Sequence, residues 1–130
     1  MNEDMLKPGI TFTSSTEVTQ DRLAAEVGSG DLPVFATPAM MALMENAAMK
    51  AVAPHLPEGS TTVGTEISST HVRPTSLGRK VSATAELLAV DGRRLDFAVT
   101  AHDEAGNLLG EGKHTRFIVD RARFMEKLEK

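Results

Sequence analysis

The sequence predicts an α+β fold in which a curved antiparallel β-sheet wraps around one long, mostly apolar helix. The stretch 35–54, FATPAMMALMENAAMKAVAP, is the longest segment that can be helical, and it is apolar on most of its surface. Strand-like segments follow it through short turns, which favours antiparallel pairing. Such a sheet must bury its apolar face against another element, and only this helix is large enough.

Two kinds of segment precede the helix. Residues 10–18, ITFTSSTEV, are rich in threonine and β-branched side chains and predict a first strand. Residues 20–27 have apolar side chains at helical spacing and predict a short helix or helical turn. Residues 28–33, GSGDLP, have the most flexible composition in the chain. Because they lead directly into the long helix, they can act as a lid.

The long helix has a start signal, a stop signal and one unusual side chain. Thr37 can serve as N-cap with Pro38 as the first helical residue, and Pro54 ends the helix. Over its first turns only Glu45 and Asn46 are strongly polar. A carboxylate on this apolar surface is expected to be partly buried, which is costly without a partner. Glu45 is therefore either ion-paired or functional.

Alternating apolar and polar residues after the helix indicate strands of a half-buried sheet. These segments are 61–73, 81–89, 95–101 and 108–119, and we expect them to pair in meander order. Asp91-Gly92, between the second and third segments, is a strong hairpin signal. Residues 120–130 predict a short charged helix whose apolar side chains can pack.

The composition fits one domain spanning residues 1–130, with 41% hydrophobic and 25% charged residues. The absence of cysteine excludes disulfides and thiolate metal sites. No apolar run approaches the length of a membrane span, and the acidic N-terminus is unlike a signal peptide, so we expect a cytoplasmic protein. The net charge of −4, with phenylalanine as the only aromatic type, argues against nucleic-acid binding.

The charge is unevenly distributed. Residues 1–70 contain three Lys or Arg against nine Asp or Glu, whereas residues 71–130 contain eleven against nine. A solvated sheet surface is the ordinary explanation for such basic residues. The alternative is an anion-binding rim suited to a phosphorylated ligand. The candidates for that rim are Arg73, Arg79, Lys80, Arg93, Arg94, Lys113 and Arg116.

The four histidines have different settings. His55 lies in a turn, His102 falls on the polar face of its segment, and His114 lies near the edge of the last strand. His71 is separated by an even number of residues from the apolar residues Val63 and Ile67 of segment 61–73, so its side chain should point to the same, apolar side of the strand. No histidine pair has metal-ligand spacing, so we expect no metal site. By itself, His71 fits a hydrogen-bonded core histidine as well as a catalytic one.

Several motifs together resemble the hotdog-fold thioesterases, in particular the type that hydrolyses fluoroacetyl-coenzyme A. They are VFATPAMMALMENAA, VGTEISSTHVRPTSLG, VDGRRLDFAVTAHD and GKHTRF, which cover most of residues 34–117. The resemblance implies a hotdog fold, an acyl-CoA thioesterase, and a homodimer or tetramer with active sites at the subunit interface. It implies no cofactor, since coenzyme A enters as part of the substrate.

The resemblance also assigns residues to the site. It implies a catalytic set of Thr37, Glu45 and His71. It implies substrate-binding roles for Gly64, Phe35 and Arg116, with Gly64 next to the thioester and Arg116 as a basic residue near the site. A strand bulge at Gly64 and an ordinary surface arginine at Arg116 are the alternatives. Relatives selective for fluoroacetyl groups have lid phenylalanines before the helix. Here only Phe12 and Phe35 precede it, so we expect a short acyl group without that selectivity.

The chemistry leaves several alternatives open. Glu45 can attack the thioester directly or act as base on a water, with His71 moving protons and Thr37 orienting one of them. A non-catalytic dimeric protein that binds acyl-CoA is the main competing interpretation. Hydratase chemistry is disfavoured because the chain lacks the closely spaced Asp and His that are typical of hotdog hydratases.

Helix geometry constrains how the site is assembled. Thr37 and Glu45 are eight residues apart, and a rise of ~1.5 Å per residue separates their backbones by about 12 Å. Short side chains cannot close that gap. Either the chain before Pro38 folds back over the helix, or the partner subunit supplies one member of the set.

Overall fold

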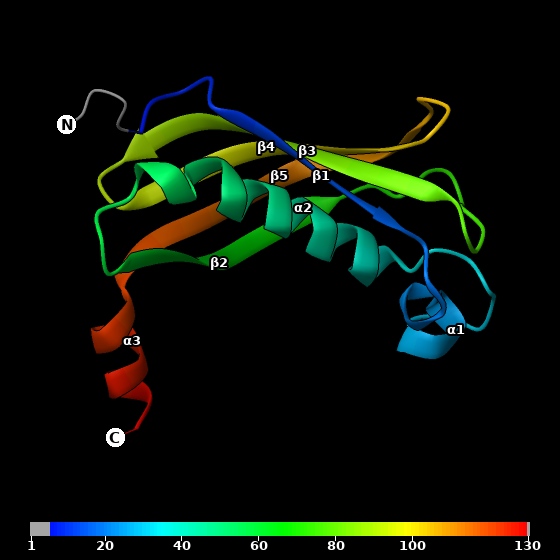
Figure 1. Ribbon diagram of the computed structural model, residues 1–130, viewed down its shortest axis with the longest axis horizontal. Helices are drawn as coiled ribbons and strands as arrows, with labels where there is room; N and C mark the ends of the chain where they lie inside the picture. Colours follow the sequence, from blue (N-terminus) through cyan, green and yellow to red (C-terminus); the bar gives the residue numbers. More distant parts are fainter. Residues whose placement is uncertain (1–5, 130) are drawn as a thin grey trace.

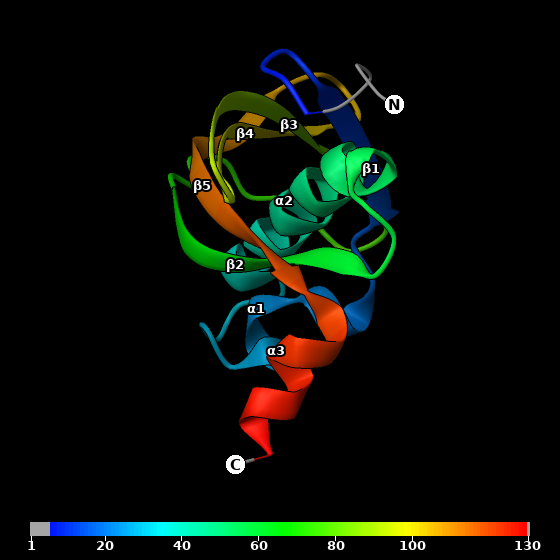
Figure 2. The same cartoon turned by 90° about the vertical axis from the view of Figure 1, so that its left-hand side faces the viewer.

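The long helix, α2 (Thr37–Val52), lies in the curve of an antiparallel sheet, as a computed structural model describing residues 6–129 shows (Figure 1). Seen from the end, the sheet curls around the helix on one side (Figure 2). The predicted α+β architecture is confirmed. The predicted domain, residues 1–130, extends beyond the described residues at both ends.

The sheet has five strands in the order β1-β3-β4-β5-β2. Their bounds are Thr11–Glu17 for β1, Ser60–Ser69 for β2, Lys80–Asp91 for β3, Arg94–Asp103 for β4 and Leu108–Asp120 for β5. The predicted hairpin joins β3 to β4, where Asp91 pairs with Arg94. The meander order was wrong for β2, which pairs with β5 instead of β3. Because β1 and β4 already occupy both sides of β3, β2 crosses to the far edge and closes the curve around α2.

The core forms where α2 meets the concave face of the sheet. Small side chains on the helix allow the strands to approach closely, and the buried helix residues are Met40, Met44, Ala47, Ala48, Ala51 and Val52. The N-cap is Ala36, not Thr37 as predicted, and it makes no side-chain capping bond. The helix gives way at Val52 to a 3-10 turn, η2 (Ala53–His55). Among the described residues, no helix is long and apolar enough to cross a membrane.

Strand β2 contains an irregularity that the alternation pattern could not show. Its register with β5 shifts between Gly64 and Glu66, as in a β-bulge. An extra residue reverses the alternation from that point. As a result Thr62, not Val63, is the buried residue before the bulge, and the predicted inward face is wrong there.

Two small structures flank the body. At the start of α2, a 3-10 turn η1 (Gln20–Arg22) and a short helix α1 (Ala24–Val27) form a separate lobe. At the other end, α3 (Arg121–Leu128) projects away from the sheet (Figures 1 and 2).

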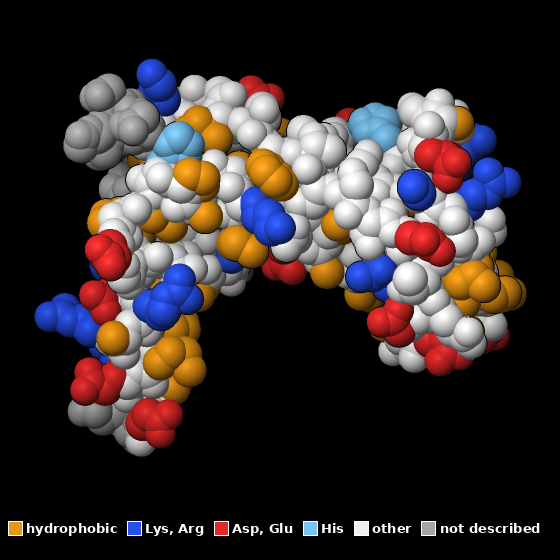
Figure 3. Space-filling model, in the orientation of Figure 1, with side chains coloured by type: hydrophobic (Ala, Val, Ile, Leu, Met, Phe, Trp, Pro, Cys, Tyr) orange, Lys and Arg blue, Asp and Glu red, His pale blue; other side chains and the backbone are white. Residues whose placement is uncertain are grey.

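The apolar side chains of α3 do not pack as predicted. Phe124, Met125 and Leu128 are 37%, 53% and 65% exposed. Figure 3 shows apolar side chains along this projecting arm. The helix is nevertheless capped, because the Asp120 carboxylate accepts a hydrogen bond from the Arg123 N–H.

Candidate active site

Two of the three predicted catalytic residues meet at the start of α2. Thr37 is the first helical residue, and His71 lies in the link that follows β2. The Thr37 Oγ1 and His71 Nδ1 atoms are 2.7 Å apart, within hydrogen-bond distance. Phe35 is 2% exposed and its ring meets His71 edge-on, with centroids 6.3 Å apart. The histidine is therefore held from one side by a hydroxyl and from another by a buried ring.

The environment of His71 favours the neutral imidazole. Partial burial lowers the pKa of His71, because desolvation disfavours the charged ring. Its Nε2 atom is buried and has no hydrogen-bond partner among the residues that the structure describes. A neutral ring oriented through Nδ1, with Nε2 uncommitted, is suited to proton transfer.

A cavity of about 260 Å³ lies beside this pair. Its wall includes Thr37 and His71, Ser29 and Val34 from the segment before the helix, and Arg73 from the link after His71. The predicted lid, residues 28–33, thus contributes to the cavity through Ser29. Main-chain hydrogen bonds connect the η1–α1 lobe to the segment just before α2. The Ala24 N–H donates to the Val34 carbonyl, and the Ala36 N–H donates to the Arg22 carbonyl.

Glu45 belongs to a different cavity, further along α2. It is half-buried, and the cavity around it measures about 410 Å³. Its lining residues are Ala42, Glu45, Asn46, Met49, Thr62, Val63, Gly64 and Arg116, none of which lines the Thr37–His71 cavity. Within one chain, the structure does not bring Glu45 to the other two predicted catalytic residues.

The chain before Pro38 does not fold back over the helix. The Phe35 N–H donates to the Thr75 carbonyl, and the Ala36 N–H donates to the Arg22 carbonyl. These bonds hold the segment against the η1 turn and the link after β2. The first of the two predicted ways of closing the gap to Glu45 is therefore absent.

Gly64 lies directly against Glu45, where β2 passes α2. A Cβ atom at this glycine would lie 3.1 Å from Glu45 Oε2 and 3.1 Å from His114 Cε1. Such contacts are tighter than nine in ten real Cβ contacts, so a side chain here would displace Glu45 or His114 by a few tenths of an ångström. The register with β5 shifts immediately after Gly64, as the bulge interpretation predicts, while the place of Gly64 next to the thioester stays a prediction.

Arg116 is a buried cation, not the surface arginine that was the alternative, and it is 8% exposed. Its Nε and Nη2 donate to the side chain and carbonyl of Thr62 at 2.7 and 3.0 Å, and its Nη1 donates to His114 Nε2 at 3.2 Å. Burial lowers the pKa of the guanidinium, and the nearby Glu45 carboxylate opposes that shift. Since an arginine stays charged in proteins, Arg116 is a fixed positive charge beside Glu45.

His114 belongs to this cluster, although the sequence did not indicate it. It lies in β5, an interior strand and not an edge, and is 2% exposed. Its Nδ1–H donates to the Glu66 carbonyl at 2.8 Å, which leaves Nε2 to accept from Arg116. Burial lowers the pKa of His114, consistent with the neutral ring that both bonds require. The available signal was its spacing of two from Arg116, which places both side chains on one face of a strand.

Comparison with known proteins identifies the family. A family model described as fluoroacetyl-CoA-specific thioesterase matches residues 18–122. The chain belongs to this family. A fluoroacetyl-CoA thioesterase of Streptantibioticus cattleyicolor is 43% identical over 95 residues, which cover 73% of this chain and 68% of the relative.

Solved structures agree with this family assignment. A mutant of the fluoroacetyl-CoA-specific thioesterase FlK matches with a TM-score of 0.89 and 35% identity, covering 98% of both chains. Another FlK mutant, in complex with acetyl-CoA, matches with a TM-score of 0.89 and 34% identity, covering 95% of this chain and 97% of that chain. A thioesterase-superfamily protein of Thermus thermophilus matches with a TM-score of 0.87 and 27% identity, covering 95% of this chain and 90% of that chain. The predicted hotdog fold and acyl-CoA thioesterase class are confirmed, and the family assignment replaces the non-catalytic interpretation.

Proposed function

We propose that this family member is a cytoplasmic homodimer that hydrolyses short-chain acyl-CoA thioesters, with Thr37 and His71 from one subunit and Glu45 from the other. The observation that supports a shared site is the division of the set within one chain. Thr37 and His71 line one cavity, Glu45 lines another, and the cavities have no residue in common. In a twofold dimer, each subunit can supply the half that the other lacks.

Hydrolysis needs an oxygen nucleophile and a way to move its proton. In this proposal the Glu45 carboxylate either attacks the thioester carbon to form a mixed anhydride or removes a proton from the attacking water. Neutral His71 accepts and returns the proton through Nε2, while the hydroxyl of Thr37 holds Nδ1. On the direct route, water adds to the acyl carbon, the C–S bond breaks, and the thiolate of coenzyme A leaves and is protonated. On the anhydride route, the C–S bond breaks as Glu45 attacks and the thiolate leaves and is protonated; water then hydrolyses the anhydride to the free acid and the Glu45 carboxylate.

The two roles of Glu45 can be separated by isotope labelling. A single turnover in H₂¹⁸O by direct water attack places the label only in the acid product. An anhydride intermediate is expected to place the label in the Glu45 carboxylate when water attacks its side of the anhydride. Label found by mass spectrometry in the peptide containing Glu45 identifies the anhydride route, whereas an unlabelled peptide fits direct attack as well as hydrolysis at the acyl side of the anhydride.

Short acyl groups without fluoroacetyl selectivity are the proposed substrates. The Thr37–His71 cavity is small, about 260 Å³. Phe12 lies on β1, is 39% exposed and does not line the cavity. Phe35 lines the cavity, but it is 2% exposed and its ring meets His71 edge-on, so it forms part of the wall and not a lid. Phe35 in this arrangement supports the histidine, and Gly64 and Arg116 form the wall next to Glu45. No cofactor is needed besides the coenzyme A of the substrate.

The test is release of free thiol from a panel of acyl-CoA thioesters. Acetyl-, propionyl-, butyryl-, fluoroacetyl- and octanoyl-CoA are compared at equal concentrations, and sedimentation gives the oligomeric state. We expect turnover of the short substrates, little of octanoyl-CoA, and a similar kcat/KM for acetyl- and fluoroacetyl-CoA. Binding without thiol release, or a monomeric active enzyme, would contradict the proposal.

A further inference from the structure

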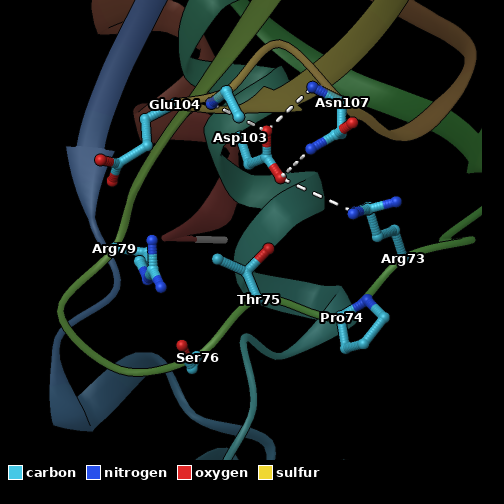
Figure 4. A pocket seen from close by; sticks show the side chains of 9 residues that line it. Arg73, Pro74, Thr75, Ser76, Arg79, Asp103, Glu104 and Asn107 are labelled. Atoms are coloured by element: carbon cyan, nitrogen blue, oxygen red, sulfur yellow. Dashed lines mark hydrogen bonds and ion pairs between the residues drawn. The ribbon is translucent and has the colours of Figure 1, made fainter.

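A second polar cavity lies next to the Thr37–His71 cavity and has no role in the chemistry above. It measures about 280 Å³ and is enclosed by the link between β2 and β3 and by the turn between β4 and β5 (Figure 4). Arg73 and Arg79 approach it from opposite sides, with Thr75 between them. Arg73 and Pro74 line both cavities, so the two are adjacent.

The carboxylates in this cavity are already engaged by the protein. Asp103 accepts hydrogen bonds from the Ala105 N–H and from the main-chain and side-chain N–H groups of Asn107 at 2.9 to 3.1 Å. The bond from the Asn107 side chain is the largest cause that lowers the pKa of Asp103. Glu104 accepts from the Lys80 N–H at 2.8 Å. Both acids therefore serve to hold the turn and the start of β3.

The donors in the cavity, by contrast, are largely unused. Arg73 is paired only through Nε, which lies 3.7 Å from the Asp103 carboxylate, so both terminal nitrogens are free of protein partners among residues 6–129. Within the same range the Arg79 side chain has no hydrogen bond or ion pair. The Thr75 hydroxyl is unpaired among those residues too, in a residue only 6% exposed. A cavity with occupied acceptors and unoccupied donors is suited to an oxyanion.

We infer that Arg73 and Arg79 form the subsite for the anionic end of the substrate, with the phosphates of coenzyme A as its ligand. This rests on the proposed hydrolysis of acyl-CoA at His71, because the arginine cavity adjoins the Thr37–His71 cavity through Arg73 and Pro74 and the pantetheine arm links the thioester to the phosphates. The structure also separates the basic residues predicted to form a rim. Arg116 is buried beside Glu45, and Arg93 and Arg94 lie at the β3–β4 turn, at the opposite end of β3 from Arg79.

The experiment compares the variant Arg73→Ala/Arg79→Ala with Arg93→Ala/Arg94→Ala, which removes the same charge from two exposed arginines far from the cavity. KM and kcat are measured with acetyl-CoA, acetyl-pantetheine and succinyl-pantetheine. Losing charge-assisted hydrogen bonds should raise KM for acetyl-CoA by roughly ten- to a hundredfold, with kcat little changed. Acetyl-pantetheine, which has no phosphate, should show no such change.

The other possible outcomes each support or overturn the subsite. A rise in KM confined to succinyl-pantetheine would retain the oxyanion subsite but assign it to a carboxylate on the acyl group. Equal effects of the two double variants on acetyl-CoA, or equal changes for acetyl-CoA and acetyl-pantetheine, would overturn the subsite. If the wild-type protein hydrolyses no thioester, the proposed function fails separately. Calorimetric titration with coenzyme A then tests the cavity directly, and equal affinity of the wild-type protein and the variant Arg73→Ala/Arg79→Ala would overturn it.

Discussion

The two ends of the proposed site differ in how they are held. The Thr37–His71 end is partly open and is fixed by one side-chain hydrogen bond and a buried ring. At the other end, Arg116 is buried and bonded through all of its guanidinium nitrogens, to Thr62 and His114. The first end has the proposed proton carrier, His71, and no Asp or Glu among the described residues that line its cavity, while the second has a carboxylate beside a fixed cation. Within one chain, therefore, neither end contains the whole of the proposed catalytic set.

The largest expected effect comes from removing the reacting group at either end. Glu45→Gln and His71→Ala should each lower kcat/KM by at least about a hundredfold, the scale of losing an acid–base group. Thiol release and circular dichroism at equal protein concentration check this. Near-wild-type turnover in either folded variant would remove that end from the site.

Subunit mixing tests whether the two ends belong to different chains. When His71→Ala and Glu45→Gln subunits exchange at random, half of the dimers are mixed and each mixed dimer has one intact shared site of two. Thiol release should therefore recover to about a quarter of wild type. Exchange is verified with mass-tagged subunits. Activity that stays at the level of the separate variants despite exchange would show that the site is not shared.

Crowding the carboxylate tests the close approach of β2 to α2. Gly64→Ala should lower kcat by about tenfold, because the new methyl group displaces Glu45 or His114 by a few tenths of an ångström. Ser68→Ala, an exposed position beyond the bulge on the same strand, is the matched control and should behave like wild type. An equal response of the two variants would mean that the position of Glu45 does not limit turnover.

The smallest effect concerns stability and its dependence on pH. His114→Phe retains the ring packing with Phe97 but removes the bonds to Glu66 and Arg116, which should cost roughly 1 to 3 kcal/mol in the free energy of unfolding. Because the pKa of His114 is lowered from its ordinary value of 6.5, the unfolded chain binds more protons just below that pH. Wild-type stability should therefore fall as the pH drops below about 6.5, and the variant should lose less. Urea unfolding between pH 5 and pH 8 gives both quantities, and identical slopes would contradict the assignment.

Local signals in the sequence were sufficient for the elements and for part of the site. Helix α2 follows from a run of good helix formers after Pro38, and the β3–β4 hairpin follows from Asp91-Gly92, because both depend on residues that are neighbours in the chain. The pairing of Thr37 with His71, and the separation of Glu45 from them, follow from motif resemblance and the rise of a helix.

Long-range pairing was decided only by the tertiary structure. Strand β2 pairs with β5 because β3 has both edges occupied, and no local pattern records that competition. The bulge after Gly64 reverses the alternation of β2 and turns Thr62 inward. The surroundings of His114 also depend on this long-range pairing, because the predicted meander order left its strand, β5, at the edge of the sheet. In the interior strand β5, the His114 ring is buried and contacts Phe97, Glu66 and Arg116. The contacts with Phe97 and Glu66 join residues far apart in the sequence, so the strand period of two residues and the helix period of 3.6 residues cannot reveal them.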